Sequence, residues 1–273
     1  MTTQAEKGRA FRALHERKQT FIIPNPWDAG TARLLAHLGF EALATTSMGC
    51  AFSLGKTDGS LSREETLECA AAIAAATNLP VSADLEKGFG DSPEEAAKTI
   101  RLAAAAGVVG GSIEDATGRA DDPIFELTHA VDRVRAAVEA ARSLPFTFTL
   151  TARAENYLHD RPDIKDTIKR LQAFQEAGAD VLYAPGLETE DDIAAVVRSV
   201  DRPVNVLMGL RGVQLSAAEL SAMGVRRISV GSSLTRAALG AFMRAATEMR
   251  DKGTFTFAAE AANSSDITAI FKR

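Results

Sequence analysis

The segment Ser82-Ala-Asp-Leu-Glu-Lys-Gly-Phe-Gly90 places two carboxylates at the end of a short apolar run. Alternate residues of a β-strand face the same side of a sheet, so a strand through this segment directs Asp84 and Glu86 to one point. Gly88 and Gly90 then allow the backbone to turn sharply. Such a pair suits a hard divalent cation such as Mg²⁺, which takes oxygen ligands. The alternative is a strand that simply runs out into solvent.

A helix start and a second strand follow this segment directly. Residues 92–95, Ser-Pro-Glu-Glu, combine a capping serine, a proline at the first helical position and acids that the helix dipole favours. That helix is predicted to end at Gly107, and the next strand, 108–113, leads to Glu114 and Asp115. A strand, a helix and a further strand in this order are typical of a parallel sheet.

The same alternation extends along the whole chain. Strands are predicted at residues 21–25, 42–47, 81–84, 108–113, 146–152, 181–185, 204–208 and 227–230. A helix is expected before the first strand, and a helix is predicted after each of the eight. Residues 48–62 are expected to form a long loop. Eight such units predict an α/β fold of the (β/α)8 TIM barrel type, and a doubly wound open sheet is the alternative.

The chain ends with more helix than a barrel needs. Its 273 residues contain no Pro/Ser-rich or charged linker, so we expect one domain, 1–273, in which 254–273 form a C-terminal helical extension. A surplus amphipathic helix has to bury its apolar face, and a neighbouring subunit is a plausible place for it.

Composition narrows the classes of partner. The net charge is −5, the acids and bases are mixed, and no apolar run approaches the length of a membrane span. We therefore expect neither nucleic-acid binding nor membrane association. The cysteines, Cys50 and Cys69, form no CxxC pair, and the four histidines are scattered. This argues against a zinc site or a disulfide framework and favours the reducing cytoplasm, with Cys50 as a small, partly buried thiol in an apolar setting.

In a barrel of this type the active site lies at the carboxyl ends of the strands. That rule brings together side chains that are far apart in the sequence: Ser47, Asp58, Asp84, Glu86, Glu114, Asp115, Arg153, Glu155 and Asn205. Several carboxylates at one mouth repel each other unless a cation lies among them. Arg153 could also bind an anionic substrate group through two hydrogen bonds.

These motifs, in this order, resemble the isocitrate lyase and phosphoenolpyruvate mutase superfamily. The resemblance covers about residues 21–231 and rests on Asn-Pro-Trp-Asp28, Thr-Ser-Met-Gly49, Thr-Asp-Gly59, Asp84 to Gly90, Ile-Glu-Asp115 and Ala-Arg153. It implies a (β/α)8 barrel with Mg²⁺, or Mn²⁺, and a small α-oxo or 2-hydroxy carboxylic acid as substrate. It also implies cleavage or formation of a C–C or P–C bond through a pyruvate-like enolate. Members commonly form homotetramers in which a C-terminal helix is exchanged; a homodimer is the alternative here.

The resemblance assigns roles to individual residues. Asp84 matches the principal metal ligand, Glu86 stands where the family usually has a second Asp, and Glu114 stands where it has a Glu. The resemblance implies that Glu86 and Glu114 reach the metal directly or through water. The substrate carboxylate and enolate oxygen would be held by Ser47 and the backbone amides of Met48 and Gly49. Asn205 is expected to be a further substrate contact because of its position on the seventh strand, and not because of the resemblance. Asp58 matches a loop acid that contacts substrate or metal, and Arg153 matches the substrate-binding arginine; we expect both to take part in catalysis.

The chain departs from the superfamily after the fourth strand. Superfamily lyases that cut isocitrate or methylisocitrate have a Lys-Lys-Cys-Gly-His loop there, and the phosphonomutases have an Asn, but residues 116–122 read Ala-Thr-Gly-Arg-Ala-Asp-Asp. We therefore favour a carbon–carbon lyase of the methylisocitrate lyase or oxaloacetate decarboxylase kind, since a decarboxylation does not need that acid loop. The alternatives are P–C chemistry on a phosphonopyruvate-like acid and a non-catalytic oligomer that binds an oxo acid. A pure scaffold has no use for a costly cluster of like charges, which disfavours the last.

Overall fold

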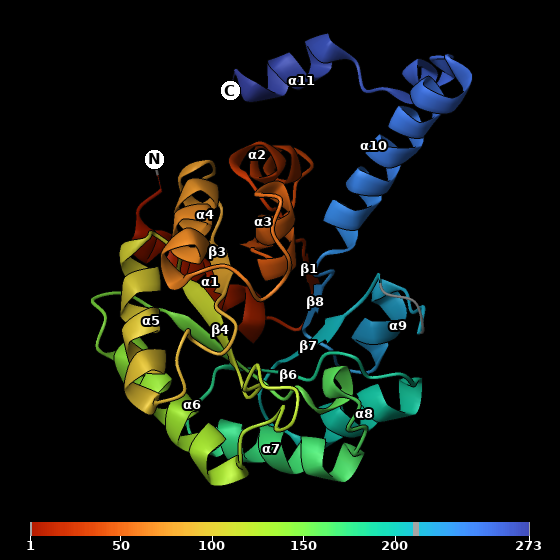
Figure 1. The fold of residues 1–273 in the computed structure, drawn as a ribbon. Helices are drawn as coiled ribbons and strands as arrows, with labels where there is room; N and C mark the ends of the chain where they lie inside the picture. The colour runs from red at the N-terminus through yellow and green to blue at the C-terminus, as the bar shows by residue number, and fades with distance from the viewer. Residues whose placement is uncertain (1, 210–212, 273) are drawn as a thin grey trace.

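The computed structural model describes residues 2–209 and 213–272, and eight parallel strands form a nearly closed barrel (Figure 1). The strands are β1 (Phe21–Ile23), β2 (Leu43–Ala44), β3 (Val81–Asp84), β4 (Gly110–Glu114), β5 (Thr149–Arg153), β6 (Val181–Tyr183), β7 (Val204–Leu207) and β8 (Arg227–Ser229). They pair in the order β1-β8-β7-β6-β5-β4-β3-β2. Between the two ends of this order, the amide of Ala44 donates to the carbonyl of Pro24 at 3.1 Å. The predicted (β/α)8 barrel is confirmed.

The helices lie largely where the sequence predicts them. They are α1 (Gln4–Glu16), α2 (Ala29–His37), α3 (Ser47–Ser53), α4 (Arg63–Ala75), α5 (Pro93–Ala105), α6 (Leu127–Arg142), α7 (Ile164–Glu176), α8 (Glu190–Ser199), α9 (Ala217–Ala222), α10 (Ser233–Lys252) and α11 (Ser264–Phe271), with 3-10 turns at Asn156–His159 and Thr256–Glu260. The Ser92 hydroxyl caps α5, as its sequence signature predicts. No helix among the described residues is both long and apolar enough to cross a membrane.

The prediction of a continuous loop over residues 48–62 is wrong. A short helix, α3, begins at Ser47, because the backbone of Thr46 is extended and its hydroxyl accepts a hydrogen bond from the amide of Gly49 at 3.3 Å. This cap turns the chain into a helix immediately after β2. The start of α3 is therefore held at the carboxyl end of the barrel.

The first helix, α1, covers the amino ends of the strands. Its Phe11 and Leu14 pack with Phe21, at the start of β1, and with Val109, just before β4. A side chain at Gly110 would meet the Phe11 ring, since an added Cβ would lie 2.7 Å from Cε1. This end of the barrel is filled with apolar side chains, which leaves the carboxyl ends for a site.

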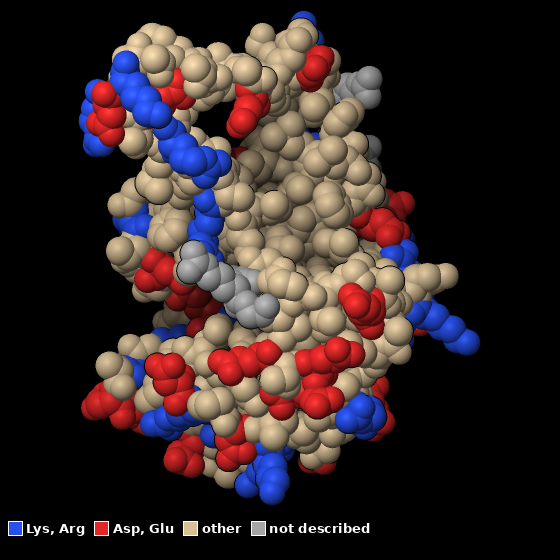
Figure 2. Space-filling view, turned by 90° about the vertical axis from the view of Figure 1, so that its right-hand side faces the viewer, with Lys and Arg blue, Asp and Glu red and all other residues tan. Residues whose placement is uncertain are grey.

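The last helices extend beyond the barrel. Figure 1 shows α10 running away from the strands and α11 returning beside α2, where Arg33 Nη1 donates to the Phe271 carbonyl at 2.8 Å. The exposed side chains of α10 include Leu239, Phe242 and Met243. The side of the molecule that carries α9 and α10 shows a broad area without charged side chains (Figure 2). Exchange of the 254–273 extension between subunits stays a prediction, as does the single-domain range 1–273, whose two end residues lie outside the described part of the chain.

Candidate active site

A cavity of about 260 Å³ lies at the carboxyl ends of the strands. Six of the predicted site residues line it: Ser47, Met48, Asp58, Asp84, Arg153 and Asn205. Three other predicted residues do not line the cavity themselves but are neighbours of lining residues, either along the chain or in space: Glu86, Glu114 and Gly49. The structure thus gathers the predicted residues at the end of the barrel where the fold rule places them.

Arg153 is the centre of a set of ion pairs. Its Nη1 lies 2.9 Å from Oδ1 of Asp84, its Nη2 3.2 Å from Oε2 of Glu114, and its Nε 2.8 Å from Oε1 of Glu155. Glu114 and Arg153 are register partners at the ends of β4 and β5, which explains their contact. Burial alone would lower the pKa of Arg153, but the three carboxylates outweigh it and hold the pKa well above its usual value. This arginine provides positive charge that the converging acids require.

Ser47 connects two of the acids. Its amide donates to Oδ2 of Asp84 at 3.3 Å, and its hydroxyl donates to Oδ1 of Asp58 at 3.0 Å. Loss of solvent raises the pKa of Asp58, and the neighbouring charge of Asp84 acts in the same direction. The loop acid that the sequence singled out therefore lies beside the helix start at Ser47.

Gly49 allows α3 to sit close to its neighbours. An added Cβ would lie 2.5 Å from Cγ2 of Thr46, 2.7 Å from Oγ1 of Thr235 and 3.0 Å from Cβ of Trp27. A side chain at this position would push the start of α3 away from the strands. The identity of residue 49 thus helps to fix the position of Ser47 and Met48 at the cavity.

The sequence argument for Glu86 is wrong in its geometry. The strand β3 ends at Asp84, and Glu86 has a φ of 48° in the following turn, so the two residues do not alternate along one strand. The Glu86 carboxylate is nevertheless placed near the other acids. Burial, followed by the charges of Asp84 and Asp58, raises the pKa of Glu86 to about 7. Its Oε1 is buried and accepts no hydrogen bond from residues 2–209 or 213–272.

The acidic side chains of the site are candidate ligands for Mg²⁺. Within the described ranges, no three His, Cys, Asp or Glu side chains are close enough together to form a ready-made metal cluster. Magnesium in proteins, however, often binds through one or two carboxylates and keeps several waters. The unpartnered buried oxygen of Glu86 and the neighbouring carboxylate of Asp84 have the chemistry that this ion requires. The residues present therefore fit Mg²⁺.

Two other predicted residues, Asp115 and Asn205, form hydrogen bonds or ion pairs within the protein that fix their side chains. Asp115 points away from the cavity, since it accepts from the amide of Glu155 at 2.8 Å and pairs with Arg170 at 3.1 Å. Asn205 is buried within the barrel, where its Nδ2 donates to Ser229 Oγ at 2.9 Å. Its Oδ1 accepts from Arg227 Nε at 2.8 Å. Asn205 lines the cavity, but its orientation is set by these two neighbours.

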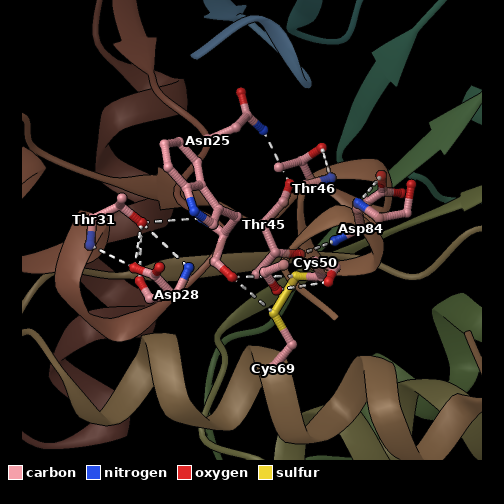
Figure 3. Close-up of a disulfide and its surroundings, with 12 residues drawn as sticks. Asn25, Asp28, Thr31, Thr45, Thr46, Cys50, Cys69 and Asp84 are labelled. Carbon is pink, nitrogen blue, oxygen red and sulfur yellow. Dashed lines mark hydrogen bonds between the residues drawn. A yellow bond between two sulfur atoms is a disulfide. The ribbon is translucent and has the colours of Figure 1, made fainter. Parts of the chain in front are cut away.

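The expectation of no disulfide is wrong. Cys50 of α3 and Cys69 of α4 are bonded, with their Cα atoms 6.5 Å apart (Figure 3). The sequence argument considered only cysteines that are close in the chain, whereas α3 and α4 bring together residues 19 positions apart. Cys50 is buried and bonded, whereas a partly buried thiol was expected. The bond joins the helix that begins at Ser47 to the outer layer of the barrel.

Sequence reasoning missed Arg227 and Tyr183, which both line the cavity. The ring of Tyr183 lies 5.3 Å from the Arg153 guanidinium carbon. Arg227 and Ser229 are alternate residues of β8 and both face the interior. Strand periodicity over 227–230 puts them on one face of the strand but does not tell which face points inward, because all three residues of β8 are buried.

The family model for phosphoenolpyruvate phosphomutase matches residues 11–250. The chain belongs to this family. Its fold is shared with a solved protein of Burkholderia cenocepacia J2315 described as a lyase or mutase, which is 64% identical, with a TM-score of 0.97 over 99% of this chain and 97% of that one. The expected membership of the phosphoenolpyruvate mutase and isocitrate lyase superfamily is thus confirmed.

Two further family relatives carry more specific names. The 2,3-dimethylmalate lyase of Eubacterium barkeri is 31% identical over 78% of this chain and 76% of its own length. A phosphonopyruvate hydrolase, solved as a complex with oxalate and Mg²⁺, is 25% identical, with a TM-score of 0.87 over 99% of this chain and 95% of that one. The family therefore includes enzymes that differ in the bond they break.

Proposed function

We propose that this protein is a Mg²⁺-dependent lyase that cleaves a C–C bond of a small α-oxo or 2-hydroxy carboxylic acid through a pyruvate-like enolate. The observation that carries the proposal is the contact of Asp84 with both the Ser47 amide and the Arg153 guanidinium at the cavity. The Asp84 carboxylate, the start of α3 at Ser47 and the Arg153 guanidinium meet at the cavity, whose size suits a small carboxylic acid.

The residues of this chain have distinct roles in the proposal. The Ser47 hydroxyl and the amide of Met48 would hold the substrate carboxylate and the oxygen on which charge develops. The Gly49 amide, which the sequence assigned to the same role, instead donates to the Thr46 hydroxyl. Arg153, which its acidic neighbours hold in one orientation, would contribute positive charge beside them. Asp58, whose pKa is raised, is placed beside Ser47 to contact the substrate and to hold or release a proton.

Asp84, Glu86 and Glu114 would hold the metal ion. Burial raises the pKa of Glu114 well above its usual value, although Arg153 opposes that shift. Such a cluster of buried acids is costly unless a cation compensates it. When bound, Mg²⁺, or Mn²⁺ in its place, supplies a Lewis acid for the oxygens of an oxo acid. The magnesium and oxalate bound by the phosphonopyruvate hydrolase support this choice of ion and ligand.

The segment after Asp115 favours a C–C lyase, which could include decarboxylation of an oxaloacetate-like acid. In residues 116–122 there is neither Cys nor Asn. The amide of Thr117 donates to the Pro123 carbonyl at 2.8 Å, and Arg119 pairs with Asp91 at 2.6 Å. The name of the 2,3-dimethylmalate lyase agrees with this preference. The second candidate, P–C bond chemistry of the mutase or hydrolase kind, rests on the phosphonopyruvate hydrolase relative.

The experiment that tests the reaction is a screen for pyruvate release with excess Mg²⁺. Oxo and hydroxy diacids of four to seven carbons, including 2,3-dimethylmalate and oxaloacetate, are offered beside phosphonopyruvate. Spontaneous decarboxylation is subtracted with the Asp84→Ala variant. We expect turnover of at least one diacid. Phosphonopyruvate is also followed by phosphorus NMR, because a mutase would convert it to phosphoenolpyruvate without releasing pyruvate. Turnover of phosphonopyruvate alone would establish P–C chemistry, and oxalate binding in calorimetry without turnover of any compound would support a non-catalytic oxo-acid-binding protein.

We also propose a homo-oligomer, a dimer or tetramer, in the cytoplasm. Ile22 of β1, on the barrel wall, is 38% exposed, and Phe242 of α10 is 70% exposed. A helix with an open apolar face and a barrel with an open apolar strand suit contact with a second copy of the chain. The cytoplasmic location is proposed from the sequence, and the Cys50–Cys69 bond argues against it, because the cytoplasm is normally reducing and would keep both residues as thiols. The redox state of the two cysteines is therefore a direct test of the location.

A further inference from the structure

Arg227 lies at the inner end of the cavity and has no role in the function proposed above. It is the first residue of β8, whereas Ser229 and Ser232, which line the same cavity, come later in the chain and nearer the carboxyl end. Only 5% of its surface is exposed. A guanidinium is therefore buried at the floor of the site, below the layer that holds Arg153.

The partners of Arg227 are uncharged. Its Nε donates to Asn205 Oδ1 at 2.8 Å, its Nη2 to Thr151 Oγ1 at 3.1 Å, and its Nη1 lies 3.4 Å from His15 Nε2. His15 Nδ1 lies 2.8 Å from the Phe11 carbonyl and donates to it, which leaves Nε2 as an acceptor for Arg227. Burial lowers the pKa of His15 to about 3, so this imidazole is neutral at ordinary pH.

The charge of Arg227 is also not compensated by a carboxylate. In the part of the chain that the structure describes, none forms an ion pair with it, in contrast to Arg153, which contacts three. Burial lowers the pKa of Arg227 to about 10, so the side chain stays protonated at neutral pH. Keeping a charge buried without an opposite charge beside it lowers the stability of a folded protein. An anion that enters the cavity offsets this cost.

We propose that Arg227 determines the charge preference of the site: its unpaired cation makes the cavity favour a ligand with two negative charges over a similar ligand with one. The inference rests on the proposed function, since it assumes that small carboxylic acids bind here. Arg227 acts in two ways. Its field attracts each negative charge of the ligand, and its hydrogen bond to Oδ1 fixes Asn205 so that the Nδ2 group faces Ser229 at the cavity.

The test compares two ligands of similar size, oxalate with two negative charges and pyruvate with one. Dissociation constants of both are measured by calorimetry with the full-length protein at the same free Mg²⁺ concentration. The variants are Arg227→Gln, which removes the charge but can still donate a hydrogen bond, and Arg227→Lys, which keeps the charge. One unit charge a few ångström away in a partly buried site changes binding by roughly tenfold for each ligand charge.

We expect Arg227→Gln to weaken oxalate binding roughly tenfold more than pyruvate binding, and Arg227→Lys to keep the ratio of the two constants within about twofold of the parent. The matched control is Arg226→Gln: Arg226 is the next residue in the chain, its Nη1 donates to the Lys18 carbonyl, and it does not line the cavity. A purely structural role would weaken both ligands by the same factor.

Each outcome is decisive. An unchanged ratio in Arg227→Gln, with the parent binding both ligands, overturns this inference and leaves the proposed function intact. A change of ratio in Arg226→Gln as large as in Arg227→Gln overturns it as well, because the effect would then be one of overall charge. If the parent protein binds neither ligand, the proposed function and this inference are both refuted.

Discussion

Nη1 of Arg153, the last residue of β5, lies 2.9 Å from Oδ1 of Asp84, the last residue of β3. Glu114 at the end of β4 lies between these strands and contacts the same guanidinium. One cation therefore compensates acids from two neighbouring strand ends. In the proposed function, a metal ion would share this task, which makes the stability of the protein without Mg²⁺ depend strongly on the arginine.

Replacing Arg153 with Met should destabilise the protein by about 3 to 5 kcal/mol without Mg²⁺, because Asp84, Glu114 and Glu155 are left without their cation. Saturating Mg²⁺ should restore part of the loss, and urea unfolding with and without the ion measures it. The control is Arg135→Met, which removes an exposed pair with Asp132 and should cost less than about 1 kcal/mol. Equal losses in both variants would contradict this account of the acidic cluster.

The Cys50–Cys69 bond should stabilise the start of the active-site helix. It closes a loop with a sequence separation of 19, for which the chain-entropy argument gives about 3 kcal/mol. Chemical reduction should lower the unfolding free energy of the parent by about that amount and leave Cys69→Ser unchanged. Two free thiols in native protein purified without reductant would show that the bond does not form.

His15 should make the folded protein sensitive to acid. Its pKa falls from the ordinary 6.5 to about 3 on folding. As the pH drops below 6.5, His15 binds a proton in the unfolded chain but stays neutral in the folded protein. The free energy of unfolding therefore decreases from about pH 6.5 towards about pH 3, and His15 does not change it above pH 6.5. From about pH 6.5 to about pH 4.5 the loss is roughly 2 to 3 kcal/mol.

The measurement is the difference in unfolding free energy between about pH 6.5 and about pH 4.5 for the parent and His15→Gln. The variant should lose less stability over this range, whereas His37→Gln, at an exposed position, should follow the parent. An equally steep decline in His15→Gln would mean that other groups account for the acid sensitivity.

The apolar face of α10 should hold the oligomer together. Leu239, Phe242 and Met243 have the spacing of one helix face and are exposed in the single chain. Phe242→Glu should convert the oligomer to a smaller species in light scattering coupled to size exclusion. Ala237→Glu adds the same charge to an exposed position on the opposite face of α10 and should leave the mass unchanged. A parent protein that is monomeric would refute this role for the helix.

The barrel and part of the cavity lining could be predicted from the sequence, because periodicity fixes the strands and the fold rule fixes which strand ends meet. Asp84 and Arg153 were found in this way. Glu86 was assigned to the right region for a wrong reason, since the strand stops two residues earlier and a left-handed turn replaces the alternation. Local spacing carries no information about a contact such as Cys50 with Cys69, which depends on how two helices pack.

Arg227 was missed for a similar reason. A charged residue at the start of an apolar strand is usually taken as its exposed end, and only the closed barrel shows that this position faces inward. The partners of the arginine come from three other elements, so no motif contains them.

The central claim, a metal-dependent oxo-acid site at Asp84, is tested most directly by calorimetric titration of oxalate with and without Mg²⁺. The parent protein should bind oxalate only when Mg²⁺ is present, and Asp84→Ala should weaken that binding by roughly 100-fold or more. Asp121→Ala, which changes an exposed acid, should bind as the parent does. Oxalate binding that is equally strong with and without Mg²⁺, or an Asp84→Ala variant that binds oxalate as tightly as the parent does, would contradict the account.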